Sequence, residues 1–473
     1  MLRTLARTRM PLRAQINTRF MSQTTAAAEE SPVLFSDNGT TRTITLNRPK
    51  KLNALDDPMC RAIFPRLKEW LKSDSANVVL FKGSGNKAFC AGGDVATLAK
   101  QNAAGAQGIE QSRDFFCTEY AMDFLLSVYP KPVIALNHGI TMGGGLGVSM
   151  HLPFRVATET TLSAMPETSI GFFCDVGGTF FLPRLDGELG TFLALTSSRL
   201  KGYEAVAAGF ATHYIPSARL DDLEKAIASL DIPKGRDATE LYSQLNALLN
   251  DYSEVPANFK FQYGGEFRAL IDRTFKYDAI EDIVAALKQE GEAGEKIIKL
   301  LGERSPTSVK VTLAALRRGR NQDIQSVFND ECNYAENFMH SREFIEGVTA
   351  KLIDKPAREP QWEPSSFEGV TPEIVKSFIQ KRPGSKNDEM EVVINDTYKQ
   401  YPWNFGLPRE VEIEQYIKGE TRSSDYKASP AEVVNHFTNK YSGKPGVSEK
   451  VKEVMQRKTK PDPNEPKVLD WVN

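Results

Sequence analysis

Residues 138–147 read HGITMGGGLG and follow a short apolar run, residues 133–136, that is typical of a buried β-strand. A second glycine turn comes earlier in the chain, where residues 87–94 read KAFCAGGD after the apolar run 78–81. The glycines of the later turn stand where a strand passes into a helix, so free backbone N–H groups and the positive end of a helix dipole face that turn. Two such turns in neighbouring connections predict two N–H donors at one site, an oxyanion hole, although an isolated glycine run is more often a packing turn.

Strand and helix patterns alternate around these two turns. Residues 43–47 alternate between apolar and polar side chains, residues 57–72 have helical spacing, and residues 154–157 again have the pattern of a buried strand. This alternation predicts an α/β layer architecture. After residue 217 the strand patterns give way to helical periodicity. The helices expected there cover residues 220–230, 238–249, 280–289, 293–301, 305–316 and 323–339.

Proline residues divide the end of the chain from the rest. Residues 355–367 contain Pro356, Pro360 and Pro364 and predict a linker into a separate C-terminal unit. That unit should contain helices at residues 372–380, 410–417, 430–441 and 448–458, before a proline-rich end that we expect to be disordered. The expected organisation is a targeting segment over residues 1–28, an α/β core over 29–235, a helical region over 236–355, and a linker with a mostly helical C-terminal extension over 356–473.

Composition and charge exclude several classes of protein. The 473 residues include 59 Lys and Arg against 61 Asp and Glu, so no global charge attracts the chain to DNA or to an anionic membrane. No apolar run reaches the roughly 18 residues that a spanning helix needs. Neither glycine turn is a dinucleotide loop or a nucleoside triphosphate loop, and no metal-ligand spacing occurs, so we expect no cofactor and no metal. The cysteines stand alone, which suits a reducing compartment: Cys60, Cys90, Cys117, Cys174 and Cys332.

The first 28 residues have the composition of a mitochondrial targeting segment. They contain five arginines with interspersed hydroxylated and apolar residues, and no acidic residue comes before Glu29. A secretory signal fits poorly, because no uninterrupted apolar segment follows the charges. We therefore expect a mitochondrial protein, with a basic N-terminal arm as the alternative interpretation.

In these motifs the sequence resembles the crotonase (enoyl-CoA hydratase/isomerase) superfamily. Residues 44–49 (ITLNRP), the KAFCAGGD turn and the GGG turn stand in the order of that superfamily's landmarks. Four motifs are similar to the branch that hydrolyses 3-hydroxyisobutyryl-CoA, namely FRVATE, AMPETSIG, DVGGTFFLPRL and ERSPTSVKVTL at residues 154–159, 164–171, 175–185 and 303–313. The resemblance covers residues 35–355 and implies a crotonase-type spiral of ββα turns, followed by a helical region that closes over the site.

The resemblance also implies which residues form the site. The positions that match the superfamily's oxyanion hole are Gly93 and Gly144, and the matching acids are Glu119, Glu167 and Asp175. Glu167 beside a polarised thioester can attack as a nucleophile and form a mixed anhydride, or it can act as the base for an attacking water. The sequence leaves both roles open.

The residue types favour hydrolysis over hydration. Gly147 stands where a hydratase of this superfamily has its first glutamate, and glycine has no proton to transfer. We therefore expect hydrolysis of 3-hydroxyisobutyryl-CoA to the free acid and CoA, in valine breakdown in the mitochondrial matrix, with CoA as part of the substrate. One position departs from the branch, because Cys174 replaces the usual proline before Asp175 and could alter the aim of that acid. Cys174 has no nearby histidine and is expected to be a buried side chain rather than a nucleophile, and His138 is expected to be structural.

The extension has no counterpart in the minimal hydrolase and favours a macromolecular partner. In some lineages a relative of this hydrolase is a peripheral protein of the mitochondrial small ribosomal subunit, and these appended helices resemble a means of docking. A structural component of that subunit, with or without activity, is therefore the alternative function. Neither a membrane nor DNA is expected as a partner. The basic residues near the C-terminus could contact phosphate or simply form a solvated helix face: Lys440, Lys444, Lys450, Lys452, Arg457, Lys458 and Lys460.

Overall fold

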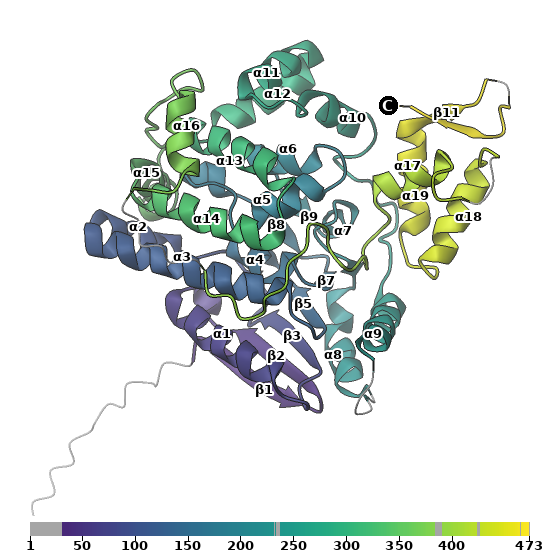
Figure 1. Ribbon diagram of the computed structural model, residues 1–473, viewed down its shortest axis with the longest axis horizontal. Helices are drawn as coiled ribbons and strands as arrows, with labels where there is room; N and C mark the ends of the chain where they lie inside the picture. Colours follow the sequence, from purple (N-terminus) through teal and green to yellow (C-terminus); the bar gives the residue numbers. More distant parts are fainter. Residues whose placement is uncertain are drawn as a thin grey trace, which may run out of the picture. The chain divides into compact units, whose positions relative to one another are not determined.

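Between residues 78 and 164 consecutive strands alternate between two sheets, and each pair of strands is followed by a helical segment (Figure 1). In the six-stranded sheet all neighbours are parallel except the first two, and its order is β1 (Val33–Asn38), β2 (Thr41–Leu46), β3 (Val78–Gly83), β5 (Val133–Asn137), β7 (Phe154–Ala157), β10 (His213–Tyr214). The four-stranded sheet is parallel except at its last strand, in the order β4 (Ala88–Cys90), β6 (Ile140–Met142), β8 (Leu162–Ala164), β9 (Leu200–Lys201). The predicted α/β spiral of ββα turns is confirmed.

The computed structural model describes residues 31–230, 232, 237–383, 390–422, 426–463 and 465–472, so the predicted targeting segment, residues 1–28, lies outside the described residues. The helices of the core are α1 (Asp57–Leu71), α2 (Val95–Ala103), α3 (Ala106–Ser127), α4 (Gly144–Met150), α5 (Gly178–Phe181), α6 (Leu189–Thr196) and α7 (Glu204–Ala207). Shorter 3-10 turns are η1 (Pro49–Lys51), η2 (Glu167–Ile170), η3 (Leu182–Arg184), η4 (Ser217–Arg219) and η5 (Lys288–Glu290). None of the described helices is long and apolar enough to cross a membrane.

The helical region begins where the sequence loses its strand patterns. Its helices are α8 (Leu220–Ala228), α9 (Ala238–Tyr252), α10 (Gly265–Thr274), α11 (Ile280–Leu287), α12 (Gly291–Gly302), α13 (Pro306–Gly319), α14 (Ile324–Met339) and α15 (Arg342–Val348), followed by a π-type turn, Thr349–Ile353. The side chains of Ser305 and Asp323 cap α13 and α14 by accepting from backbone N–H groups three residues on. These caps explain why both helices start where the sequence predicts.

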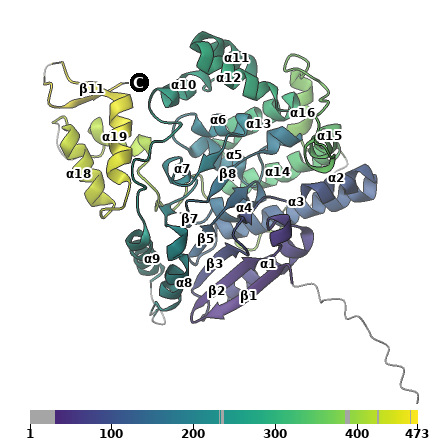
Figure 2. The same ribbon diagram turned by 180° about the vertical axis from the view of Figure 1, so that it is seen from behind.

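The six-stranded sheet is buried on both faces. Side chains of Val79 and Phe81 on β3 belong to the main core, whereas Val78 and Leu80 of the same strand pack with apolar side chains of α8 and α9 on the opposite face. Figures 1 and 2 both show α8 and α9 beside β7 and β5. A parallel sheet covered on both faces needs continuous apolar strands, which is the pattern that the sequence has.

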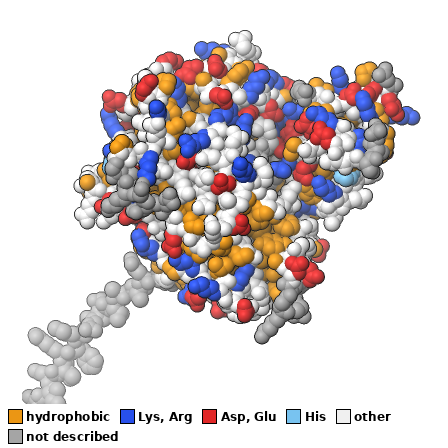
Figure 3. Space-filling model, viewed as in Figure 1, with side chains coloured by type: hydrophobic (Ala, Val, Ile, Leu, Met, Phe, Trp, Pro, Cys, Tyr) orange, Lys and Arg blue, Asp and Glu red, His pale blue; other side chains and the backbone are white. Residues whose placement is uncertain are grey.

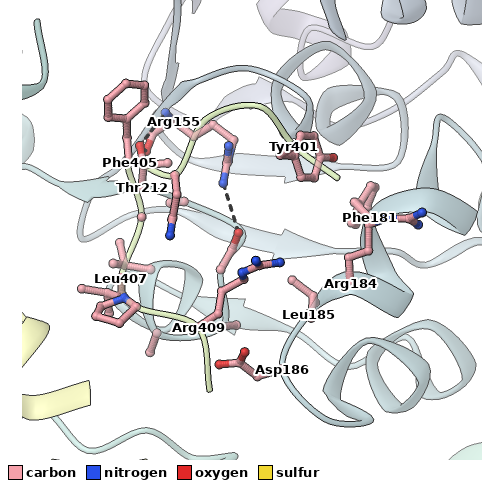
Figure 4. A pocket seen from close by; sticks show the side chains of 18 of the residues that line it. Arg155, Phe181, Arg184, Leu185, Asp186, Thr212, Tyr401, Phe405, Leu407 and Arg409 are labelled. Carbon is pink, nitrogen blue, oxygen red and sulfur yellow. Dashed lines mark hydrogen bonds between the residues drawn. The ribbon is translucent and has the colours of Figure 1, made fainter. Parts of the chain in front are cut away.

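The C-terminal extension packs on the core instead of forming a separate unit. Residues 390–409, here called the strap, run as an extended segment along the core in Figure 1 and enclose a cavity of about 140 Å³ against it (Figure 4). Phe405 of the strap stacks on Phe154 of β7 with ring centroids 4.6 Å apart, and Arg184 donates from Nε to the carbonyl of Lys399 at 3.0 Å. Residues 32–473 form one compact unit, which corrects the expectation of a separate unit behind a linker.

Three helices and a hairpin complete the extension after α16 (Pro372–Ile379) and the strap. Helices α17 (Glu410–Ile417), α18 (Pro430–Lys440) and α19 (Val447–Lys458) share a small apolar core. The end of the chain, expected to be disordered, instead forms an antiparallel pair of strands, β11 (Thr459–Pro461) and β12 (Leu469–Trp471). Lys427 donates to both Asp462 and Asp470 and thereby holds the two strands together at the start of α18.

Most of the basic residues near the C-terminus are occupied within the protein. The buried Lys444 donates to Asn250 of α9 at 2.9 Å, and Lys450 pairs with Asp186 of the core at 2.7 Å. On this part of the surface in Figure 3, Lys and Arg side chains lie beside Asp and Glu side chains. These contacts argue against both sequence-based interpretations of the C-terminal basic residues. The side chains form neither a basic face that is free to bind phosphate nor a helix face that is wholly exposed to solvent. Further ion pairs join Lys440 to Glu412, Arg457 to Glu410 and Glu453, and Lys458 to Asp272 and Glu410.

Candidate active site

The two glycine turns lie side by side, because the strands that precede them, β4 and β6, are parallel neighbours. Leu55 donates to the carbonyl of Gly92 and accepts from the N–H of Asp94, so the N–H of Gly93 faces away from Leu55. Gly144 is the first residue of α4, and its N–H therefore has no partner within the helix. A methyl group at Gly144 would lie 3.4 Å from the Gly93 nitrogen, so the structure brings the two predicted N–H donors together.

Two of the predicted acids meet at these glycines. Glu119 lies on α3 and is 1% exposed, and its Oε1 is so close to Gly144 that a methyl group there would overlap it. Glu167 is the first residue of η2 and is 5% exposed, and a methyl group at Gly143 would lie 2.8 Å from its Oε1. Gly143 has φ +46°, a conformation that favours glycine. Both carboxyl groups therefore approach the turn at Gly143 and Gly144, here called the oxyanion turn after its predicted role, as closely as glycine allows.

The third predicted acid, Asp175, lies in the loop between η2 and α5 and is buried. Its Oδ2 accepts a hydrogen bond from the hydroxyl of Tyr120 at 2.7 Å. Tyr120 is the neighbour of Glu119 on α3, so one helix presents a carboxyl group to the glycine turn and a hydroxyl group to Asp175. In the sequence, only the position of Tyr120 directly after Glu119 indicates that it could lie near the site.

Burial dominates the electrostatics of these acids. It raises the pKa values of Glu119 and Glu167 well above their ordinary range, and the nearby charge of Asp175 raises them further. Burial raises the pKa of Asp175 to about 7, against the lowering effect of the Tyr120 hydrogen bond. Among the described residues, Oε1 of Glu119 and Oε2 of Glu167 have no hydrogen-bond partner. Asp175 can therefore hold and release a proton near neutral pH, whereas burial favours the protonated forms of Glu119 and Glu167.

Two further buried acids were missed by sequence reasoning. Glu331 on α14 accepts from the N–H of Gly177 at 2.6 Å and from the N–H and hydroxyl of Thr179, and thus holds the loop after Asp175. Burial raises the pKa of Glu331 to about 8. The sequence carried no signal for this acid, because it lies on α14, more than 150 residues from the loop that it holds.

Asp123 is the second missed acid, and it lies one helical turn after Glu119. It is fully buried, and neither of its carboxyl oxygens has a hydrogen-bond partner among the described residues. Its carboxyl group occupies the space that a side chain at Gly147 would enter. Gly147 thus leaves room for Asp123. The sequence analysis treated Gly147 only as the position of an absent glutamate and did not predict this role.

Replacing Asp123 should change how stability depends on pH. Burial, with the charges of Glu119, Asp175 and Glu331, raises the pKa of Asp123 well above its ordinary value. The folded protein then keeps a proton where the unfolded chain has lost it, so this group lowers the free energy of unfolding as the pH rises above about 4. Asp123→Asn should therefore become more stable relative to wild type as the pH is raised from about 5 to about 8.5, measured by urea unfolding.

The matched control is Asp114→Asn, which removes an exposed carboxyl group from the same helix. Its stability relative to wild type should not follow the trend expected for Asp123→Asn. Parallel curves for wild type and Asp123→Asn across this pH range would contradict the interpretation of Asp123 as a buried, proton-holding carboxyl group.

Cys174 and His138 have the structural roles that the sequence favoured. Cys174 is fully buried, and burial with the nearby charge of Glu167 raises the pKa of its thiol well above the usual value, which disfavours a nucleophilic thiolate. His138 Nδ1 lies 3.0 Å and 3.1 Å from the hydroxyls of Thr158 and Thr160. In the part of the chain that the structure describes, no group of three or more His, Cys, Asp or Glu side chains could hold a metal ion.

A cavity of about 560 Å³ lies next to this site, and Asp94, which follows Gly93, is among the residues that line it. Leu55 and Phe115 line it, and their side chains would lie 3.4 Å and 3.6 Å from methyl groups placed at Gly144 and Gly93. Its rim carries cations that are paired with carboxylates: Arg48 with Asp56 and Asp94, Lys51 with Asp94, and Arg61 with Asp57. The cavity is large enough for the end of an extended ligand whose reacting group reaches the two glycines.

A family model described as Enoyl-CoA hydratase/isomerase matches residues 41–379. The match covers most of the chain and includes both glycine turns and all the acids described above. The protein belongs to the enoyl-CoA hydratase/isomerase family, the crotonase superfamily, and the resemblance read from its motifs is confirmed.

Similar proteins include both enzymes and a ribosomal component. A carnitinyl-CoA dehydratase of known structure from Mycobacterium thermoresistibile is 33% identical, with a TM-score of 0.67, over 76% of this chain and 99% of that one. A mitochondrial 3-hydroxyisobutyryl-CoA hydrolase from Danio rerio is 44% identical over 73% of this chain and 88% of that protein. The small ribosomal subunit protein mS47 of Neurospora crassa is 43% identical over 95% of this chain and 92% of that protein. The last match therefore extends into the C-terminal extension.

Proposed function

We propose that the protein hydrolyses an acyl-CoA thioester in mitochondria, with 3-hydroxyisobutyryl-CoA as its substrate and no separate cofactor. The observation that carries this proposal is the convergence of the Gly93 and Gly144 N–H groups with the carboxyl groups of Glu119 and Glu167. An oxyanion hole polarises the thioester carbonyl, and an adjacent carboxylate supplies either a nucleophile or a base. The hydrolases among the relatives, at 38–44% identity, support this substrate.

The thioester carbonyl oxygen would accept hydrogen bonds from the N–H groups of Gly93 and Gly144. As the carbonyl carbon becomes tetrahedral, its oxygen gains charge, and each such donor lowers the barrier by about 3 to 4 kcal/mol. If Glu167 attacks, a mixed anhydride forms and the CoA thiolate leaves, and water then cleaves the anhydride. If Glu167 acts as a base, it takes a proton from water, which attacks the carbonyl directly.

Asp175 would transfer the proton, and Glu119 would contact the substrate. The pKa of Asp175, about 7, allows this group to give a proton to the departing thiolate and take one from water in the same cycle. Glu119 is adjacent to Gly144 and would contact the acyl group of the substrate. The CoA portion would extend through the cavity that Leu55 and Phe115 line.

A panel of short acyl-CoA thioesters tests the proposal directly. We expect CoA release to be fastest with 3-hydroxyisobutyryl-CoA, and we expect crotonyl-CoA to be hydrated slowly by comparison, because position 147 is glycine and Asp123 fills the space beside it. Thiol release and loss of the conjugated double bond are followed in parallel. Faster hydration than thioester cleavage would contradict the proposal.

A second candidate function is association with the mitochondrial small ribosomal subunit. The observation that favours it is the match to a small ribosomal subunit protein over 95% of this chain. The hydrolases match only 73–78% of this chain. The two functions are compatible, because the acids and the oxyanion turn are all present in a chain that also carries the extension. Co-sedimentation of the full-length protein with the subunit tests this candidate.

A further inference from the structure

One hydroxyl group of the strap is connected to the loop that follows Asp175. The hydroxyl of Tyr401 lies 2.9 Å from Nδ1 of His151, and Nε2 of His151 lies 3.0 Å from the carbonyl oxygen of Val176. His151 is fully buried and directly follows α4, the helix that begins at Gly144. The strap, the oxyanion helix and the acid-bearing loop therefore share one histidine.

The chemistry of the three groups fixes the direction of both hydrogen bonds. A carbonyl oxygen only accepts, so Nε2 of His151 carries the proton and donates it to Val176. Burial lowers the pKa of His151 to about 4, so its ring is neutral at physiological pH and Nδ1 is an acceptor. The hydroxyl of Tyr401 therefore donates to Nδ1 and holds the ring in the tautomer that binds the loop.

The loop needs such support because its backbone is strained. Val176 has φ +55°, which is unfavourable for a β-branched residue and persists only where the surroundings impose it. Gly177 follows with φ +76°, and any side chain there would overlap the ring of His151. The ring thus packs directly on the loop whose carbonyl group it binds.

A second set of contacts connects the strap to the same loop from the other side. The carbonyl of Tyr398 accepts from the N–H of Ile324 at 3.0 Å, and Thr397 donates to Asp323 at 2.8 Å. Both contacts lie at the start of α14, and this helix carries Glu331, which binds the N–H of Gly177. The carbonyl of Val176 is therefore held by a residue that contacts the strap, and the N–H of Gly177 is held by a residue of a helix that contacts the strap at its start.

We propose that the strap positions Asp175, with Tyr401 as the positioning residue that acts through His151 and Val176. The family model ends at residue 379, so this element lies outside the part of the chain that the family shares. The role of Asp175 as a proton carrier rests on the proposed function. The arrangement makes the C-terminal extension a part of the enzyme, whatever else the extension binds.

Tyr401→Phe tests the proposal in the full-length protein, because it removes the hydroxyl group and keeps the ring. We expect kcat for the thioester to fall about tenfold with KM within about twofold, since a small displacement of a reacting group lowers the rate more than the affinity. Hydrogen exchange over residues 172–181, measured by mass spectrometry, should be faster by at least about threefold.

Tyr398→Phe is the matched control, because it removes a hydroxyl from the same strap that donates to the carbonyl of Ser127 on α3. It should leave both kcat and the exchange of residues 172–181 as in wild type. Equal effects of the two variants, or no effect of Tyr401→Phe on either measurement, would overturn the proposal. If wild type fails to hydrolyse any thioester, the proposed function is wrong, while the exchange measurement still tests the link from Tyr401 to the loop.

Discussion

Glu167→Gln should lower the turnover of 3-hydroxyisobutyryl-CoA at least about a hundredfold, the contribution of one acid-base group. The amide keeps the shape of the side chain but can neither attack the thioester nor take a proton from water. The carboxyl group of Glu167 lies against Gly143 in the oxyanion turn, so no other described carboxyl group occupies its place. Steady-state release of CoA measures the effect.

Glu159→Gln is the control, because Glu159 accepts from Ser217 at the surface and has no part in the site. Its turnover should match wild type. A single turnover in water labelled with ¹⁸O separates the two roles of Glu167. If water attacks the thioester directly, the label enters the product acid. If Glu167 forms an anhydride and water attacks its side-chain carbonyl, the label enters Glu167. Near-normal turnover of Glu167→Gln would refute both roles.

Ending the chain after Ser366 should abolish folding and activity. Such a truncation removes α16, whose Phe378 packs on Phe338 with ring centroids 4.5 Å apart, and the strap with Tyr401 and Phe405. Apolar surface of the main core and of β7 would then face water, at a cost of about 25 cal/mol for each Å² exposed. The sequence interpretation of the extension as a separable unit predicts the opposite, a catalytic rate within a few-fold of wild type.

A second truncation, after Pro408, separates the strap from the three C-terminal helices. It keeps Tyr401 and Phe405 and removes α17–α19. The ion pairs of Lys450 with Asp186 and of Glu410 with Arg268 are lost with these helices. We expect this shorter protein to melt at a lower temperature, to retain activity within a few-fold, and to lose co-sedimentation with the mitochondrial small ribosomal subunit. A soluble and active protein ending at Ser366 would contradict the packing described here, and unchanged sedimentation after Pro408 would remove α17–α19 as the docking element.

The core could be predicted from sequence because its signals are local. Continuous apolar runs such as 78–81 mark strands that are covered on both faces, and each glycine turn follows one of them. Ser305 and Asp323 mark helix starts by their own side chains. The resemblance then assigned Glu119 and Glu167, which no spacing could have brought together, because α3 and η2 meet only in the folded chain.

The packing of the strap and the burial of Asp123 and Glu331 could not be predicted from the sequence, for a different reason. Tyr398, Tyr401 and Phe405 have neither helical nor strand spacing, so periodicity gives no indication of what they pack against. Proline residues in the linker suggested a boundary, but the chain beyond it follows the core surface. Asp123 and Glu331 are charged residues, for which exposure is the ordinary expectation, and only the folded arrangement shows them buried beside the site.

The hydrogen bond between His151 and Tyr401 joins residues 250 positions apart. A ribosome synthesises every strand of both sheets and helix α4 long before the strap exists, because these elements lie within the first half of the chain. The loop that carries Asp175 receives its last support only after Tyr401, residue 401 of 473, has been synthesised. Synthesis of the strap, rather than formation of the core, is therefore the event that would complete the proposed active site.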